Sequence, residues 1–335
     1  MDGCRNAFGM INRAHAEGIR DELIIHFHRP GHRVWHMHGI SADLQNRAVG
    51  AAYEPGSVQK VLTLASLLDA GVTTPDTTYR IGSEIMIDTH KVTDAFRHGD
   101  MSITTRGILV NSSNIGAITA ARTMDKVKLQ DYMAKFGLGQ KTTLGLPGEA
   151  AGKLPGPKLY DYERDSMAYG YGLSVTSVQM AAAVATVANG GVYNEPSIVS
   201  ATTCNGVRTP APAPEQHRVI SATAAQQAVE MMEQKTIHDR PKTWVDGYRT
   251  ATKTGTARIA ASQGGYVGQV ASMVGVAPVE DPQILVYVLV ARPDQQGAGL
   301  GMAGPVYKDV MSLALPRYGV KPSERMVETQ LPLSK

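Results

Sequence analysis

The segment Tyr53-Glu54-Pro55-Gly56-Ser57-Val58-Gln59-Lys60 joins a turn to the start of an apolar helix, and the predicted architecture depends on it. Pro55 and Gly56 break regular structure, and an apolar run over 61–68 ends near Gly71, which is typical of a helix end. Ser57 is therefore expected at the helix start, with Lys60 one turn later on the same face. A backbone N–H at a helix N-terminus is unpaired and suits a developing oxyanion. The Ser-x-x-Lys spacing alone also fits a capping serine beside a solvated lysine.

Composition limits the classes of function. The 335 residues can form one large domain or two modest ones, and the hydrophobic and charged fractions are those of a globular protein. The formal net charge of +3 is small, and no block of Lys and Arg occurs, so a nucleic-acid partner is not expected. The two cysteines, Cys4 and Cys204, make neither a disulfide framework nor a metal quartet.

No segment predicts a membrane helix or a secretory signal. The longest apolar stretch, residues 284–291, has the length of a strand, whereas a membrane helix needs roughly 20 apolar residues. The N-terminus lacks the basic and then apolar layout of a signal peptide. As given, the chain is expected to be soluble.

Residues 1–45 differ from the rest of the chain. Leu23–Phe27, Pro30-Gly31 and Val34–Met37 can be interpreted as strand, turn and strand of a β-hairpin. Six of the ten histidines also lie here: His15, His26, His28, His32, His36 and His38. No carboxylate or cysteine stands at ligand spacing, so a metal site is the weaker interpretation and none is predicted.

The order of the remaining elements predicts an α+β fold. An all-helical subdomain is expected beside an antiparallel sheet flanked by helices. Residues 72–103 are interpreted as loops and hairpins, and residues 140–165 and 201–219 as loops. The other predicted helices cover about 104–124 (interrupted at 111–114), 125–136, 177–188, 221–235 and 303–315, and the predicted strands cover 248–259, 267–276 and 284–292.

Three polar signatures follow one another along the chain: Ser57-x-x-Lys60, Ser112-Ser113-Asn114 and Lys253-Thr254-Gly255-Thr256. The first begins a helix, the second stands between two helices, and the third lies on a strand. Each is common alone. Together, in these contexts, they form the set of the penicillin-recognising serine enzymes.

The residue types of the first two signatures suit acyl transfer. A neutral Lys60 near pH 7 requires a pKa about 3 units below the usual value, or about 4 kcal/mol. Burial and a second cation, for which Lys253 is the obvious candidate, both act in that direction. Lys60 could then remove the proton of Ser57 as this serine attacks a carbonyl. Ser112 would pass the proton to the leaving amine, and Asn114 could hold an amide of the acyl chain and touch Lys60.

The third signature suits a ligand that lies along a strand. Lys253, with the hydroxyls of Thr254 and Thr256, could bind a substrate carboxylate. Gly255 has no side chain, which would let a ligand lie flat against the strand edge. The backbone N–H groups of Ser57 and Thr256 would then form the oxyanion hole.

The chain resembles the transpeptidase domain of class B penicillin-binding proteins, most closely the division-specific branch. The resemblance predicts three parts: a poorly matching segment 1–45, the transpeptidase domain over 46–320, and a C-terminal tail over 321–335. Matching text includes Asn46–Val49, Tyr53–Ser57, Asn111–Gly116, Phe136–Gly139, Leu144–Glu149, Tyr169–Leu173, Gly247-Tyr248, Lys253–Ala257 and Gly275–Pro278.

The resemblance implies a peptidoglycan D,D-transpeptidase with the α+β fold of the penicillin-binding-protein and β-lactamase type. Ser57 would be acylated by the penultimate D-Ala of a stem peptide, and the amine of a neighbouring strand would resolve the acyl-enzyme into a cross-link. β-Lactams would acylate the same serine. It also implies that no cofactor or metal is used and that the protein works at the outer face of the bacterial cytoplasmic membrane. Its partners there would be a cell-wall polymerase and other division proteins.

Two alternatives stay open. A serine β-lactamase shares all three signatures but needs a base for deacylation, and Glu149 is the only nearby candidate by its order in the chain. The other alternative is an inactive, truncated penicillin-binding module, which the poorly matching N-terminal segment favours.

Overall fold

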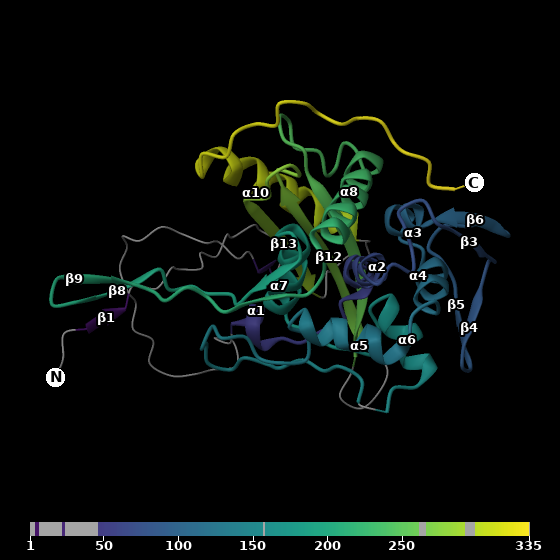
Figure 1. The fold of residues 1–335 in the computed structure, drawn as a ribbon, viewed down its shortest axis with the longest axis horizontal. Helices are drawn as coiled ribbons and strands as arrows, with labels where there is room; N and C mark the ends of the chain where they lie inside the picture. The colour runs from purple at the N-terminus through teal and green to yellow at the C-terminus, as the bar shows by residue number, and fades with distance from the viewer. Residues whose placement is uncertain are drawn as a thin grey trace.

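The computed structural model describes residues 4–6, 22–23, 46–156, 158–260, 266–291 and 299–334. Its central sheet has helices on both faces and a helical lobe at one end, where α3–α6 gather (Figure 1). This is the predicted α+β arrangement.

Helix α2 (Gln59–Asp69) is the centre of the helical core. It begins directly after a short 3-10 turn, η2 (Gly56–Val58), and ten of its eleven residues are buried. It packs against α3, α4, α5, α6, α7 and α8. A helix surrounded by so many others is mostly apolar, and its buried polar side chains, Lys60 and Ser66 among them, make hydrogen bonds inside the protein. Gly71 follows with φ of +70°, a backbone conformation that glycine adopts without strain.

The sheet is antiparallel, with the strand order β11-β12-β13-β2 among the described residues. Its strands are β11 (Ala251–Ala260), β12 (Tyr266–Ala277), β13 (Ile284–Ala291) and the short β2 (Glu22–Leu23). Val270 and Val274 point to the core shared with α7 (Ser177–Ala188) and α8 (Ala222–His238), whereas Ala271 and Met273 point to α10 (Gly304–Arg317). Successive side chains of a strand alternate between the two faces of the sheet, and helices cover both faces, so both sets of side chains are buried.

The helical lobe contains α3 (Thr105–Asn111), α4 (Asn114–Ala121), α5 (Lys126–Lys135) and α6 (Asp161–Ala168). Two small antiparallel pairs join it: β3 (Thr78–Ile81) with β6 (Met101–Thr104), and β4 (Ile85–Ile87) with β5 (His90–Val92). The predicted interruption at 111–114 is confirmed. Ser112 there adopts φ of +58°, and Ser113 caps α4 by accepting the N–H of Gly116.

Two predicted loops were wrong in part. The segment 140–165 contains the start of α6, whose first turn is closed by the Tyr160 N–H donating to Glu163 and whose Asp165 is buried against Arg122. The segment 201–219 contains a hairpin of β8 (Ala201–Cys204) and β9 (Val207–Pro210), and then β10 (Gln216–Arg218), which pairs with β7 (Val192–Asn194). The hairpin turns at Asn205-Gly206, both with positive φ, a strong hairpin signal. It projects from the body, and its largely exposed strands lack apolar alternation (Figure 1).

The chain after α10 runs back across the molecule to the helical lobe (Figure 1). The Leu333 carbonyl accepts hydrogen bonds from the N–H and the hydroxyl of Thr104, the residue that caps α3. A Cβ added to Gly107 would lie 2.0 Å from that carbonyl oxygen. The segment predicted as a tail therefore forms part of the packing of α3.

The N-terminal segment is described only at β1 (Cys4–Asn6) and β2. The predicted hairpin over 23–37 lies outside the described residues except for Leu23, which pairs with β13, and so do the six clustered histidines. β1 pairs with β8 in a register that sets Cys4 opposite Cys204, and Cys204 is disulfide-bonded. Among the described residues no helix is long and apolar enough to cross a membrane.

We expect Gly107→Ala to lower the free energy of unfolding by about 1–3 kcal/mol, because the added methyl group displaces the Leu333 carbonyl from α3. Equilibrium denaturation measures this. Gly301→Ala in α9 (Gly299–Met302) is the matched control: no atom of the described residues lies within 4 Å of the new Cβ, so stability should hold or rise slightly. Equal effects of the two substitutions would contradict the assigned role of the C-terminal segment.

Candidate active site

Ser57 and Lys60 meet as predicted. Ser57 lies in η2 and Lys60 in the first turn of α2, and the Lys60 Nζ is 3.0 Å from the Ser57 Oγ. Lys60 is fully buried, whereas Ser57 is partly exposed. A hydroxyl that a ligand can reach therefore touches an amine that water cannot.

The other contacts of Lys60 orient its amine. The Nζ lies 2.6 Å from the Ser112 carbonyl oxygen and 2.7 Å from Asn114 Oδ1. Both oxygens only accept hydrogen bonds. A neutral amine has two N–H bonds for these oxygens, which leaves its lone pair for the proton of Ser57. The geometry suits a general base.

Ser112 connects the two lysines. Its Oγ is 2.9 Å from the Nζ of Lys253 and 3.4 Å from the Nζ of Lys60. The left-handed backbone at Ser112, between α3 and α4, turns both its carbonyl and its hydroxyl toward the site. A proton taken by Lys60 can thus reach a leaving group through the Ser112 hydroxyl.

The third signature lies on β11, the edge strand of the sheet among the described residues. Lys253 is fully buried and also donates to the Thr254 carbonyl at 2.7 Å. Thr254 and Thr256 are partly exposed, and the Thr256 hydroxyl accepts the N–H of Gly299 at 3.0 Å. The oxyanion-hole role of the Ser57 and Thr256 N–H groups stays a prediction.

The structure gives Gly255 another role than the predicted one. A Cβ at this position would lie 2.5 Å from Ser272 Oγ and 2.9 Å from a methyl group of Val58, so the missing side chain faces the protein. A Cβ at Gly56, where φ is +55°, would lie 2.6 Å from the Thr256 carbonyl oxygen. These two glycines let η2 approach β11 closely enough to set Ser57 beside the strand.

Burial is the largest influence on both lysines. It lowers the pKa of Lys60 to about 7. The charge of Asp94 raises this pKa, and the charge of Lys235 lowers it. Burial, and then the charges of Lys235 and Lys60, hold the pKa of Lys253 well below its ordinary value, with Asp239 acting in the opposite direction.

Lys235 was missed in the sequence. It is buried on α8 and donates to Asp239 at 2.7 Å, and it replaces Lys253 as the main second cation acting on Lys60. The i,i+4 spacing of Lys235 and Asp239 in the helix before β11 was the available signal.

Asp94 was also missed, because it lies in an irregular loop. Its side chain is fully buried beside the Ser112–Asn114 turn, where Ser113 donates to Asp94 Oδ2 at 2.6 Å. No spacing rule connects it to the three signatures.

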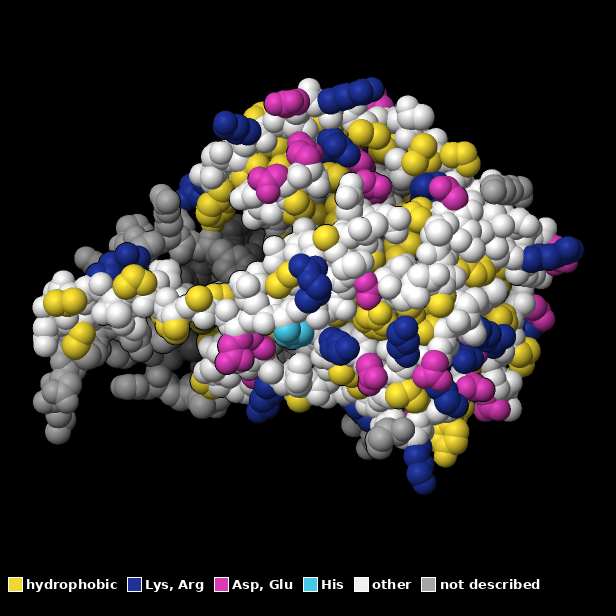
Figure 2. Space-filling model, viewed as in Figure 1, with side chains coloured by type: hydrophobic (Ala, Val, Ile, Leu, Met, Phe, Trp, Pro, Cys, Tyr) yellow, Lys and Arg dark blue, Asp and Glu magenta, His cyan; other side chains and the backbone are white. Residues whose placement is uncertain are grey.

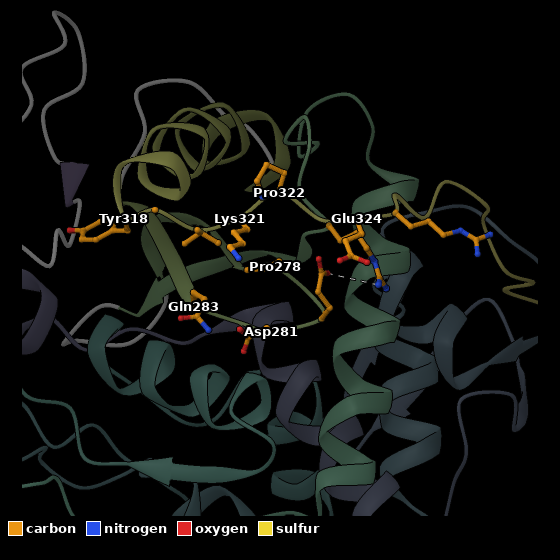
Figure 3. Close-up of a pocket in the computed structure, with 12 residues that line it drawn as sticks. Pro278, Asp281, Gln283, Tyr318, Lys321, Pro322 and Glu324 are labelled. Atoms are coloured by element: carbon orange, nitrogen blue, oxygen red, sulfur yellow. Dashed lines mark ion pairs between the residues drawn. The ribbon is translucent and has the colours of Figure 1, made fainter.

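A groove of about 640 Å³ lies away from these residues, beside the β12–β13 turn and the chain after α10 (Figure 3). Pro278, Asp281, Lys321 and Glu324 are among its lining residues, and none of the predicted site residues is. On the face shown in Figure 2, Lys and Arg side chains are interspersed with those of Asp and Glu. Among the described residues no group of three His, Cys, Asp or Glu could hold a metal ion.

Glu149 is held by Thr142. It is buried, and Oε1 accepts from the Thr142 N–H at 2.8 Å and from the Thr142 hydroxyl. Both of these hydrogen bonds come from Thr142, which lies outside the three signatures, so the geometry does not favour a deacylating base at Glu149.

Comparisons with known proteins agree with this geometry. Residues 16–312 match the family described as the penicillin binding protein transpeptidase domain. The chain is 35% identical over 299 residues to penicillin-binding protein PbpB of Mycolicibacterium smegmatis, covering 84% of this chain and 46% of that protein. It is 32% identical over 290 residues to peptidoglycan D,D-transpeptidase FtsI of Escherichia coli K12, covering 83% and 46%.

A solved structure is also similar. Penicillin binding protein 3 of Mycobacterium tuberculosis, complexed with aztreonam, superimposes with a TM-score of 0.80 at 30% identity, covering 88% of this chain and 68% of that one. The chain spans less than half the length of the two curated relatives.

We expect the rate of Ser57 acylation to rise with pH through about 7 and then to level off, because only the neutral Lys60 amine can accept the proton. Intact-protein mass measured over time with an acylating β-lactam at a series of pH values gives this rate. A rate that stays flat from about pH 5.5 to about pH 8.5 would contradict the role of Lys60 as the base.

Proposed function

Because the chain belongs to the penicillin-binding-protein transpeptidase family, we propose that it is a serine-type D,D-transpeptidase of peptidoglycan. Ser57 Oγ bonds to the carbonyl carbon of the penultimate D-Ala of a stem peptide. The peptide C–N bond breaks, and the terminal D-Ala leaves with the proton that Ser57 lost. The amine of a second stem peptide then attacks the ester, which forms the cross-link and restores the Ser57 hydroxyl.

The contact between Ser57 and a buried Lys60 is the observation that carries this proposal. Lys60 receives the proton of Ser57 during attack, and Ser112, in contact with Lys60 and Lys253, passes it to the departing amine. Such a positioned base contributes typically 10²–10⁴-fold to a rate. Asn114 Oδ1 fixes the Lys60 amine, and the second hydrogen of Nδ2, beside the one donated to Thr93, would bind an amide carbonyl of the acyl chain.

Binding of the substrate carboxylate would change the charge states of Lys253 and Lys60. In the free protein two buried amines stand on either side of Ser112, so they disfavour each other's charge. A carboxylate bound by Thr254 and Thr256 would favour the charged form of Lys253, and this charge in turn would favour a neutral Lys60. Substrate binding would thereby prepare the base.

β-Lactams are proposed as ligands of the same serine, since the structure of the Mycobacterium tuberculosis relative is described as a complex with aztreonam. The names of the relatives, FtsI and stage V sporulation protein D among them, support a role in septal wall synthesis. The cell-wall polymerase and the division proteins are proposed as partners on the resemblance alone.

We place the protein at the outer face of the bacterial cytoplasmic membrane. The disulfide at Cys204 supports this, because disulfides persist in oxidising compartments and are rare in the cytosol.

The deciding experiment is incubation with a penicillin, followed by intact-protein mass and peptide mapping. We expect a stable adduct on Ser57 in the wild-type chain and none in Ser57→Ala, because Ser57 is the partly exposed hydroxyl at the start of α2 that touches the proposed base Lys60. An adduct that forms and soon disappears would establish a β-lactamase instead. A folded protein that never forms an adduct would establish the inactive module.

We expect Lys253→Ala to lower the acylation rate most for ligands that carry a carboxylate, because the buried lysine that would be charged beside that carboxylate is lost. The loss should be about tenfold or more, the size of a charge-assisted hydrogen bond. Lys242→Ala, an exposed lysine before β11, is the control. An equal loss for ligands without the carboxylate would count against this role of Lys253.

A further inference from the structure

The loop before β6 contains a carboxylate that the proposed reaction has not used. Asp94 Oδ1 accepts the backbone N–H groups of Asn114 and, at 3.0 Å, of Ile115. Asp94 Oδ2 accepts the Ser113 hydroxyl at 2.6 Å and lies 3.1 Å from His98 Nε2. The side chain is fully buried. Three of these four partners belong to the first residues of the Ser112-Ser113-Asn114 signature and α4.

The same loop fixes the Asn114 side chain. Asn114 Nδ2 donates to the Thr93 carbonyl at 2.9 Å, and Asn114 Oδ1 accepts from Lys60 at 2.7 Å. A carbonyl accepts only, so the Thr93 contact selects the orientation in which the amide oxygen faces Lys60. Thr93 and Asp94 thus hold both the backbone and the side chain of Asn114.

The turn that they hold needs such support. Ser112 is a non-glycine residue at φ of +58°, a conformation that costs about 1–2 kcal/mol and persists only when the surrounding structure fixes it. Its carbonyl and hydroxyl are the groups that touch Lys60 and Lys253. A shift of this turn would therefore move the contacts of both lysines.

We propose that Asp94 is the positioning residue of the active site: it anchors the Ser112–Asn114 turn against Lys60 and provides the buried negative charge that faces this lysine. The charged groups that act on Lys60 are Asp94 and Lys235, and Lys253 lies across Ser112 from it. Asp94 is the one carboxylate among these three. His98, itself bonded through Nδ1 to the Gly99 carbonyl at 2.8 Å, holds Asp94 from the other side.

Two substitutions separate anchoring from charge. The amide of Asp94→Asn can still accept the two backbone N–H groups but removes the charge, whereas Asp94→Ala removes both. Asp165 offers matched controls, Asp165→Asn and Asp165→Ala. It is a buried carboxylate of the same lobe that binds Arg122, the residue after α4, at the end far from Ser112.

The first measurement is the rate of Ser57 acylation by benzylpenicillin on folded protein as a function of pH. Asp94→Ala should lower the plateau rate about 10²-fold, the size of a misplacement of about 1 Å, and Asp165→Ala should change it less than about threefold. In Asp94→Asn the rising limb should move to lower pH, because a charge that favours protonated Lys60 is gone. A plateau equally lowered in both alanine variants, or an unmoved limb, would overturn the proposal.

This inference rests on the proposed function, so a second readout does not use acylation. NMR of 13C-labelled lysine should show Lys60 titrating at lower pH in Asp94→Asn than in the wild type or in Asp165→Asn. If the wild type forms no adduct but Lys60 shifts in this way, the proposed function fails and the positioning role stands. If an adduct forms and the titration of Lys60 does not shift, the proposed function stands and the positioning role of Asp94 fails.

Discussion

The burial of one amine organises this protein. Lys60 is fully enclosed at the start of α2, and its amine touches Ser57, the Ser112 carbonyl and Asn114. An isolated ammonium would be costly to bury, so the group gives up its charge more readily and its pKa falls to about 7. The surrounding helices are what exclude water from it, and a solvated lysine at the same spacing would remain a cation and could not act as a base.

The second requirement is a close approach between η2, at the start of α2, and the sheet strand β11. Gly56 of η2 lies against β11, and Gly255 of β11 lies against Val58 of η2. Neither position has room for a side chain. This junction sets Ser57 from η2 beside Thr256 of β11, and sets Lys253 where the Ser112 hydroxyl can reach it. The chain after α10 contacts the capping residue of α3, at the opposite end of this helix from Ser112, so the C-terminal residues support the same geometry.

Sequence reasoning was most accurate where one residue's role follows from its neighbours. The apolar run after Ser57 predicted α2, the interruption at 111–114 was correct, and the three strands of the sheet were found to within a few residues. It was wrong for α6, a short polar helix whose buried side is held by the Asp165–Arg122 ion pair, and for the β8–β9 hairpin, whose exposed strands carry no apolar alternation. The Asp165–Arg122 contact lies outside the local pattern, whereas the Asn205-Gly206 turn was a local signal of the hairpin that sequence reasoning missed.

The sequence by itself determined the chemistry of this protein: a serine one turn from a lysine, a second serine with an asparagine, and a second lysine on a strand. It could do so because these residue types occur at short, fixed spacings along single elements. Only the tertiary structure decided which distant groups tune that chemistry. The packing of separate elements sets Asp94 and Lys235 near Lys60. It also decides that the open side of Gly255 faces Val58 and Ser272. Coulomb interactions and steric contacts depend on distance in space, which the order of residues along the chain does not give.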